Sequence, residues 1–382
     1  MIQVNELVVL PPPVVTRPVP PRYRSRVNSH LNRLAVVAAG ALLLAGCDGG
    51  TESALRPHAQ RPRSSPSGPR PFTVAFGGDV HFQDGLRDRL AHPGSALGPM
   101  AARLRAADLA MVNLETAVTT RGTPVPGKRY TFRAPKTAFR ALSGAGVDVA
   151  TMANNHAVDY GSVGLRDSLA AIRTSRFPTV GIGRNAARAY RPWRTTVKGN
   201  RVAVLGATQV IDDNLVTAWT ATARHPGLAS AKKVGRMVRA VKAARKGSDV
   251  VIVYLHWGEE YRPCPLARQK SLARRLAAAG ADIIVGGHAH RPLGAGRLGN
   301  AYVDYGFGNF VFSLKHGLDH GPQSHRSGVL TLQVTGRKVT RSTWSPAVIK
   351  NGIPRPLTGK AASTAVTRWE ALRKCTGLDR VG

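Results

Sequence analysis

The stretch ATMANNHAVDYG, residues 150–161, joins a buried strand to a helix and places polar side chains at the junction. The segment GVDVAT (146–151) that leads into it is apolar and bounded by small residues, which is typical of a short buried strand. Asn154, Asn155 and His156 therefore lie where a strand becomes a helix. Such side chains either cap the helix or bind a ligand, because ligands in α/β sheets bind beyond the carboxyl ends of the strands.

The same alternation of strand and helix continues along the chain. The predicted strands are 72–77, 108–113, 146–151, 179–183, 201–206, 249–255, 281–286, 301–304, 309–313 and 328–334. The predicted helices, rich in Ala, Leu and Arg, are about 84–106, 136–145, 161–176, 230–247 and 265–280. This order predicts a layered α/β fold with largely parallel strands, and the closely spaced late strands indicate antiparallel pairs.

The N-terminal part has the pattern of an export signal followed by a tether. Arginines between 22 and 33 precede the apolar run LAVVAAGALLLAGC (34–47), which has the length of a signal-peptide core and is too short to span a bilayer. The run ends in small residues and Cys47, similar to a bacterial lipobox. We predict a lipoprotein signal peptide over 1–46, a tether over 47–70 and lipidation at Cys47, with a cleaved secretory signal as the alternative. The protein is then exported and lipid-anchored to the outer face of the bacterial cell membrane.

The charge balance is strongly basic, with 55 Lys and Arg against 21 Asp and Glu and a net charge of +34. Arginine is scattered along the chain, and no basic block is interleaved with aromatic residues. We therefore expect dispersed surface charge and no nucleic-acid partner, while an anionic polymer or membrane stays open.

The three cysteines fit an exported chain. Once Cys47 is lipidated, Cys264 and Cys375 remain and could form one disulfide. The absence of a CxxC pair argues against a cysteine-based zinc site.

Metal-capable side chains follow one predicted strand after another. They are Asp79 and His81 in GGDVHF, Glu115 in NLET, Asn155 in ANNH, His256 in LHWGEEY, and His288 and His290 in GGHAH. These carboxylates, amide and imidazoles, without a thiolate, suit Mn, Fe or Zn better than Ca or Mg. A single histidine after a strand is commonly structural, but an ordered series at strand ends favours a metal centre. The set is large enough for two divalent transition-metal ions that share a bridging carboxylate.

The ordered motifs GGDV, NLET, ANNHAVDYG, HWGEEY, GGHAH and YGFGNFVFS resemble the bacterial capsule-synthesis protein CapA family. That family is associated with poly-γ-glutamate capsule production and is related to the calcineurin-like metallophosphoesterases. The resemblance implies a four-layer sandwich over 71–356, two mixed β-sheets flanked by helices, and leaves 357–382 as an extension with a short helix. It also implies a hydrolase in which metal-bound hydroxide cleaves a phosphoester or γ-glutamyl bond.

The resemblance also implies a role for each site residue. Asp79 and His81 would bind one ion, Glu115 would bridge, Asn155 and His256 would bind the second ion, and His288 and His290 would go one to each. His156 would be the general acid, and Asp159 could orient its imidazole. CapA relatives commonly have another residue at position 81, so the His81 ligand departs from the family pattern.

Candidate substrate-binding residues lie in two other motifs. Lys128 and Arg133 in KRYTFRAP would meet an anionic substrate or lie in a solvated loop. Asn309 in GNF would hydrogen-bond substrate or fix a turn. The expected partners are an anionic polymer or small anionic substrate and capsule-synthesis membrane proteins. The alternatives are a non-catalytic anchor or scaffold for anionic polymer synthesis or export, and an extracellular phosphodiesterase or nucleotidase.

Overall fold

The computed structural model describes residues 68–381. The predicted signal peptide, Cys47 and most of the predicted tether lie outside these residues. Within the described part, none of the helices has the length and apolar character needed to cross a membrane.

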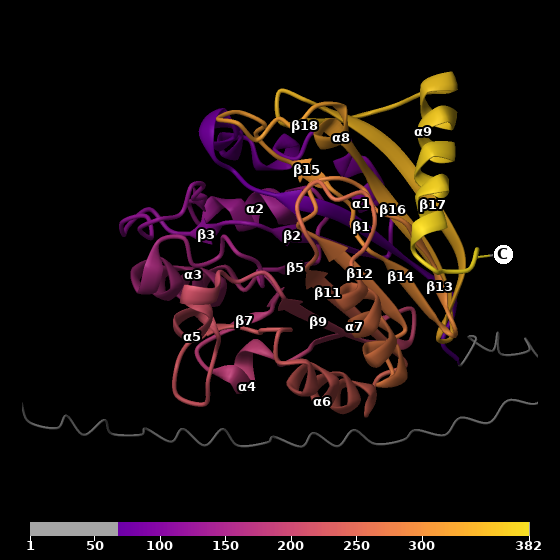
Figure 1. The fold of residues 1–382 in the computed structure, drawn as a ribbon, viewed down its shortest axis with the longest axis horizontal. Coiled ribbons are helices and arrows are strands. Elements are labelled where there is room, and N and C mark those ends of the chain that lie inside the picture. The colour runs from indigo at the N-terminus through magenta and orange to yellow at the C-terminus, as the bar shows by residue number, and fades with distance from the viewer. Residues whose placement is uncertain (1–67, 382) are drawn as a thin grey trace, which may run out of the picture. The chain divides into compact units, whose positions relative to one another are not determined.

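The described chain is built on two mixed β-sheets (Figure 1). The first sheet has the order β18 (Ile353–Pro356), β17 (Lys338–Lys350), β16 (Arg326–Thr335), β1 (Phe72–Val80), β2 (Leu109–Leu114), β5 (Val149–Thr151) and β6 (Thr179–Val180), with β15 (Asn309–Val311) also paired to β1. The second sheet has the order β13 (Ala295–Leu298), β14 (Ala301–Asp304), β12 (Ile283–Gly287), β11 (Val250–His256), β9 (Asn200–Thr208) and β8 (Trp193–Val197). Two small sheets pair β3 (Ala117–Val118) with β4 (Arg133–Ala134) and β7 (Ile182–Gly183) with β10 (Gly227–Leu228).

The pairing directions agree with the sequence pattern. Strands β1, β2, β5 and β6 are parallel, as are β9, β11, β12 and β14. The late strands β16, β17 and β18 form antiparallel pairs, and β13 pairs antiparallel with β14. The predicted mixed α/β architecture is therefore confirmed.

Side-chain alternation along β1 shows how the layers form. Val74 and Phe76 belong to the core between the two sheets, together with Ile252 of β11, whereas Ala75 belongs to the core that holds Leu142 of α2. Successive side chains of a strand point to opposite faces, so the first sheet has an inner face toward the second sheet and an outer face toward helices. The result is a four-layer sandwich.

Helices cover the outer faces of both sheets. The first sheet packs against α1 (Ala101–Arg105), α2 (Thr137–Gly144) and α3 (Gly161–Ser175), and the second against α6 (Val234–Arg245) and α7 (Ala267–Ala278). The shorter helices are α4 (Ala186–Ala189), α5 (Val216–Trp219) and α8 (Pro322–His325). The C-terminal α9 (Gly359–Ala371) runs alongside β17 (Figure 1).

Two sequence expectations differ from the structure. The helix predicted over 84–106 is instead two 3-10 helices, Asp84–Ala91 and Pro93–Ser95, followed by the short α1. The Pro93–Gly94 pair interrupts the helical hydrogen bonds, which explains the break. The strand predicted over 179–183 divides at Gly181, which has a φ of 85°. A Cβ at that position would lie 2.4 Å from the Ala153 Cβ, so the close turn requires glycine.

The cysteines whose pairing the sequence left open form a disulfide. Cys264 and Cys375 are bonded, with a sequence separation of 111 residues and 5.7 Å between their Cα atoms. The bond ties the loop after β11 to the 3-10 helix Leu372–Cys375 that follows α9. The C-terminal segment is thereby fixed to the second sheet's side of the molecule.

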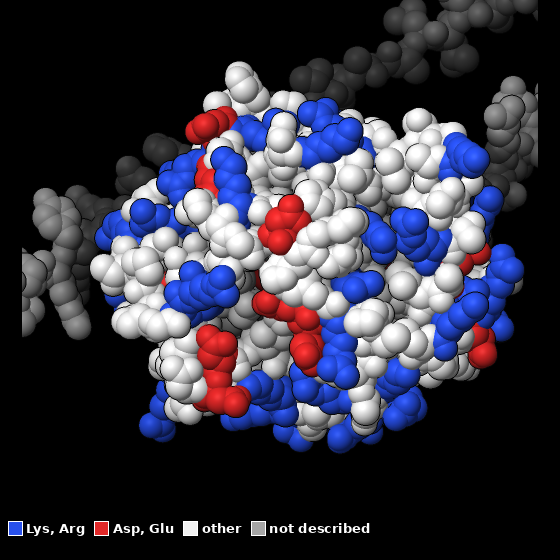
Figure 2. All heavy atoms as spheres, turned by 45° about the horizontal axis from the view of Figure 1, so that its top comes forward, with Lys and Arg blue, Asp and Glu red and all other residues white. Residues whose placement is uncertain are grey.

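Basic side chains are spread over the face shown in Figure 2, with acidic side chains in small groups among them. This dispersed arrangement agrees with the scatter of arginine along the sequence.

Candidate metal centre

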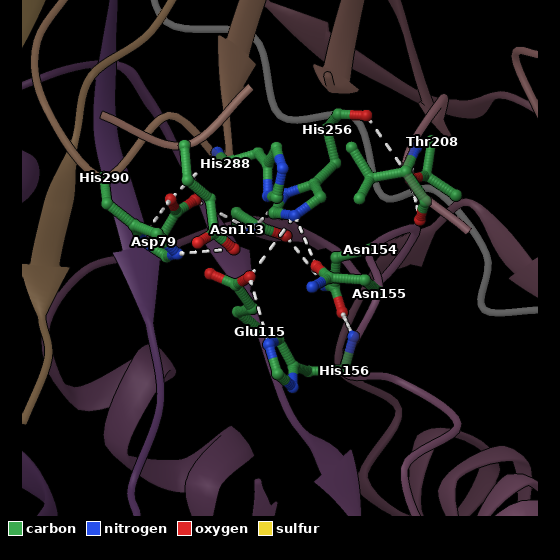
Figure 3. A network of polar contacts seen from close by, with 12 residues as sticks. Asp79, Asn113, Glu115, Asn154, Asn155, His156, Thr208, His256, His288 and His290 are labelled. Atoms are coloured by element: carbon green, nitrogen blue, oxygen red, sulfur yellow. Dashed lines mark hydrogen bonds and ion pairs between the residues drawn. The ribbon is translucent and has the colours of Figure 1, made fainter. Parts of the chain in front are cut away.

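The predicted metal ligands come together where the two sheets end at the same side (Figure 3). Asp79 is the penultimate residue of β1, Glu115 follows β2, His256 ends β11 and His288 follows β12. All four side chains are buried. They come from both sheets, so the site exists only because the sheets pack face to face with their parallel strands ending together.

The buried side chains form two groups that could each hold a cation. Asp79, Glu115 and His256 offer ligand atoms within 4.8 Å of one another, as do Glu115, His288 and His290. Glu115 belongs to both groups, and Figure 3 shows its carboxylate facing the other side chains of the cluster. This is the placement expected of a bridging carboxylate.

Unpartnered polar atoms at the centre provide a test of the metal interpretation. Among the described residues, both carboxylate oxygens of Glu115 and the Nδ1 of His288 are buried without a hydrogen-bond partner. Buried polar atoms are nearly always paired, because leaving them unpaired costs about 1–3 kcal/mol each. A divalent cation would satisfy these atoms, so the donor set fits a metal site.

Asn155 lies on the His256 side of the centre. Its Oδ1 is 2.7 Å from the Nε2 of His256, and the same nitrogen is 3.3 Å from Oε1 of Glu115. Asn155 comes from the loop after β5 and is buried. The structure therefore brings together six of the seven predicted ligands.

His81 is the exception. Its ring nitrogens lie 3.0 Å from the backbone nitrogen of Gln83 and 3.1 Å from that of Ser313. The ring stacks on Phe132 with centroids 4.2 Å apart. A neutral imidazole can accept a hydrogen bond from only one of these two N–H groups, and neither metal group found among the described residues includes His81. The ligand role of His81 stays a prediction, and the structure shows its ring packed against Phe132 and Phe312.

Asn113 is a site residue that the sequence interpretation missed. Its Nδ2 donates to Oδ1 of Asp79 at 2.9 Å and lies 3.1 Å from Nδ1 of His256. Its Oδ1 accepts a hydrogen bond from Asn154 at 2.9 Å. Asn113 is directly opposite Asp79 in the pairing of β1 with β2. The signal for it was the NLET motif itself, in which Asn113 precedes Glu115 by two residues on the same face of the strand.

His156 stands beside the metal groups with its orientation held by a carboxylate. Its Nδ1 is 2.6 Å from Oδ2 of Asp159, and its Nε2 is 4.0 Å from Oε1 of Glu115. The Asp159 carboxylate also accepts a hydrogen bond from the backbone nitrogen of Phe132 at 2.7 Å, and the Phe132 ring stacks on the imidazole at 4.1 Å. The imidazole is therefore fixed in position and presents its Nε2 toward the Glu115 carboxylate.

The predicted substrate-binding residues are engaged elsewhere. Lys128 donates to Oδ1 of Asp159 and to the backbone oxygen of Asn155, both at 2.5 Å, and its side chain is only 9% exposed. Its charge holds the loop that carries Asn155, and the substrate contact expected of Lys128 stays a prediction.

Arg133 and Asn309 also have internal partners. The Arg133 guanidinium lies 4.8 Å from the centroid of the Tyr160 ring. Oδ1 of Asn309 is 2.7 Å from Nδ1 of His290, and its Nδ2 donates to the backbone oxygen of Ser324. Asn309 therefore positions His290, and a substrate contact of Asn309 or Arg133 stays a prediction.

The electrostatics of the centre favour a bound cation. Burial and then the charge of Glu115 raise the pKa of Asp79 to about 6. Burial also raises the pKa of Glu115 and lowers the pKa of His256 to about 4. Burial disfavours the protonated form of His290, but the charges of Glu115 and Asp79 outweigh this and raise its pKa. A divalent cation would stabilise the charged carboxylates and the neutral imidazoles at once.

The GGHAH turn requires its glycine and an unusual backbone. A Cβ on Gly287 would lie 2.3 Å from Oδ1 of Asp79, so only glycine lets this carboxylate enter the centre. His288 and His290 have φ values of 89° and 52°, a region that costs non-glycine residues energy. The backbone nitrogen of His288 donates to Oδ2 of Asp79 at 3.0 Å and compensates part of that cost.

Two packed mixed sheets with outer helices, and a buried Asp, Glu, Asn and His cluster beyond the ends of their strands, define a layered α/β protein with a candidate metal centre. The family can be stated more closely. A family model described as "Bacterial capsule synthesis protein PGA_cap" matches residues 73–314, so the chain belongs to this family and the resemblance inferred from the motifs is confirmed.

Curated relatives carry names from capsule synthesis. The chain is 32% identical over 245 residues to a "Capsule biosynthesis protein CapA" of Bacillus anthracis, covering 63% of this chain and 57% of the relative. It is 33% identical over 210 residues to a "PGA biosynthesis protein CapA" of Bacillus subtilis, covering 54% of each. The matched region spans just over half the length of these relatives.

Solved structures include a similar chain described as a hypothetical protein from Thermus thermophilus. It is 20% identical, with a TM-score of 0.46, and the match covers 73% of this chain and 100% of that one.

Proposed function

We propose that this protein is a metal-dependent hydrolase that acts in capsule or poly-γ-glutamate metabolism and cleaves a phosphoester or γ-glutamyl bond. The observation that carries the proposal is the placement of His156. Its imidazole lies beside Glu115, which belongs to both metal groups, but is itself in neither group, and a buried carboxylate orients it. A site that only stored or transported a cation would not need such a group.

The proposed cofactors are two divalent transition-metal ions, Mn, Fe or Zn. Asp79, His256 and Asn155 would hold one ion, His288 and His290 the other, and Glu115 would lie between the two. Bound there, the ions would supply Lewis-acid activation of water and of the substrate oxygen.

The chain's own residues supply proton transfer and positioning. His156 donates a proton from Nε2 to the leaving group, because that atom faces the centre while Nδ1 is held by Asp159. Lys128 keeps the Asp159 carboxylate in place and is buried with it. Asn113 contacts the side chains of Asp79 and His256 and keeps them in position, and Asn309 does the same for His290.

The test is a substrate panel on the metal-loaded protein that includes nucleotides, aryl phosphoesters and γ-linked polyglutamate of each stereochemistry. We expect turnover of at least one phosphoester or γ-glutamyl substrate. We also expect His156→Gln to keep its metal content while it loses activity by about 10²- to 10⁴-fold, the usual contribution of a general acid. Equal activity of the two proteins on every substrate would remove His156 from the mechanism.

A second candidate function is a non-catalytic anchor for an anionic polymer during synthesis or export. The basic side chains spread over the face in Figure 2 favour it. Binding of polyglutamate that survives metal removal and falls steeply with salt, without turnover on any panel substrate, would support this role.

We further propose that the protein is exported and anchored by lipid at Cys47 on the outer face of the cell membrane, where capsule-synthesis membrane proteins would be its neighbours. Cys47→Ala should release it from the membrane fraction.

A further inference from the structure

A cavity lies between α9 and the β16–β17 pair. Its volume is about 260 Å³, and none of the metal-centre residues named above line it. One wall is apolar, formed by Trp344 of β17 and Trp369 of α9. Their rings stack with centroids 5.3 Å apart and planes 5° from parallel, and both side chains are buried.

Three arginines line the same cavity from three parts of the chain. They are Arg291, which directly follows His290, Arg326 at the start of β16, and Arg368 in α9. Within residues 68–381, no carboxylate lies within ion-pair distance of any of them, although other arginines of the chain are paired. Arg291 donates only to the backbone oxygen of Tyr261.

The arginines also affect one another. Burial lowers the pKa of Arg326, and the next cause is the positive charge of Arg368. Like charges without a counterion raise the energy of one another. An anion between them would reverse this effect and bind through charge-assisted hydrogen bonds.

Two buried donors of the lining are left without partners. The Nε of Arg291 and the indole nitrogen of Trp369 have no hydrogen-bond acceptor among the described residues, and Trp369 is only 8% exposed. Unpartnered buried donors are uncommon because each costs free energy. An oxyanion provides the acceptors that these donors lack.

From these observations we infer that the cavity between α9 and β16–β17 is a binding site for a small amphiphilic anion. The ligand would have a carboxylate or phosphate-type head group held by Arg291, Arg326 and Arg368, and an apolar chain or ring against the Trp344–Trp369 pair. An apolar pocket with a few converging polar groups is the usual form of a small-molecule site. The inference does not depend on the proposed hydrolase activity.

The test is calorimetric titration of the purified full chain with 4-phenylbutyrate, which joins a carboxylate to an apolar body. Acetate tests the head group alone, 4-phenylbutanol tests the body alone, and phenylphosphonate tests the phosphate-type head group. We expect one molecule of 4-phenylbutyrate or phenylphosphonate to bind per chain with a Kd below about 1 mM, and acetate and 4-phenylbutanol to bind at least tenfold more weakly. Whichever of the two anions binds more tightly identifies the head group.

The variant that locates the site is Arg326→Gln. It should weaken binding at least tenfold, because a charge-assisted hydrogen bond is lost. Arg103→Gln, on the exposed surface of α1, makes the same change in net charge and should leave the affinity within twofold. If circular dichroism shows that Arg326→Gln is misfolded, Arg368→Gln on the exposed side of α9 replaces it.

Three results would overturn the inference. They are the absence of binding to the wild-type chain, binding of acetate as tight as that of 4-phenylbutyrate, and equal loss of affinity in the Arg326 and Arg103 variants.

Discussion

Removing one partner of the buried ion pair between Lys128 and Asp159 should strongly destabilise the folded protein. The loss of unfolding free energy can be predicted from the burial of both groups. The Asp159 side chain is fully buried and that of Lys128 is 9% exposed. The carboxylate accepts from Lys128 and from the Phe132 backbone, and it holds the His156 ring. Asp159→Asn keeps the shape but leaves the ammonium buried without its counterion. Breaking a buried pair in this way costs about 3–5 kcal/mol of unfolding free energy.

A double-mutant cycle isolates the interaction energy of the Lys128–Asp159 pair from the other effects of the two mutations. Lys128→Met retains the apolar stem and removes the ammonium, which also lies 5.2 Å from the centroid of the Trp219 ring. In the double variant no isolated charge remains, so its loss should be smaller than the sum of the two single losses by at least about 2 kcal/mol. The measurement is urea unfolding at pH 7 followed by tryptophan fluorescence.

The control for this cycle is the surface pair of Lys232 and Asp213, joined at 2.7 Å with the Asp213 side chain 99% exposed. Asp213→Asn should leave the unfolding midpoint unchanged, because exposed pairs are screened by water. Additive losses in the Lys128–Asp159 cycle, or an Asp159→Asn loss below about 1 kcal/mol, would refute the reasoning from burial.

Three other predictions concern the metal centre and the disulfide. Metal content after dialysis should fall as the pH is lowered through about 6, because the pKa of Asp79 is raised to about 6 and its protonated form cannot bind a cation; equal metal by elemental analysis at pH 5 and pH 7.5 would contradict this. Glu115→Gln should abolish the rise in melting temperature on adding Mn²⁺ or Zn²⁺. Without metal, in the presence of a chelator, the variant should be at least as stable as the wild type, since a buried carboxylate without hydrogen-bond partners is removed. Replacing Cys264 and Cys375 by serine should lower the free energy of unfolding in guanidinium by about 4–5 kcal/mol, because the bond closes a long loop. A reductant should have the same effect on the wild type and no effect on the double variant.

The part of the site that sequence could predict is the part that depends on local pattern. Asp79, Glu115, His256 and His288 are recognisable because each ends or follows an apolar, β-branched run. Parallel strands place such residues at one edge of a sheet, whatever the details of packing. The four-layer architecture follows from the same alternation of strand and helix once the family is recognised.

The sequence could not predict which of several polar side chains near a strand end would contact the metal centre. His81 and Asn113 each lie two residues from a predicted ligand at the end of a strand, His81 from Asp79 and Asn113 from Glu115, and the sequence interpretation selected the histidine. The structure turns the His81 ring onto backbone groups and Phe132, and it directs Asn113 to Asp79 and His256. Lys128 and Asn309 likewise have internal partners that no local pattern indicates.

By itself, then, the sequence determined the order of strands and helices, the kind of ligand atoms at the strand ends and the family of the protein. Only the tertiary structure decided which of those atoms share one centre. It also decided that Lys128 forms an ion pair with a buried carboxylate, and which arginines line the cavity beside the Trp344–Trp369 pair. The physical reason is the separation along the chain of the residues that interact. Strand and helix patterns arise from neighbours within a few residues, whereas Asp79 meets His288 209 residues away only because two sheets pack face to face.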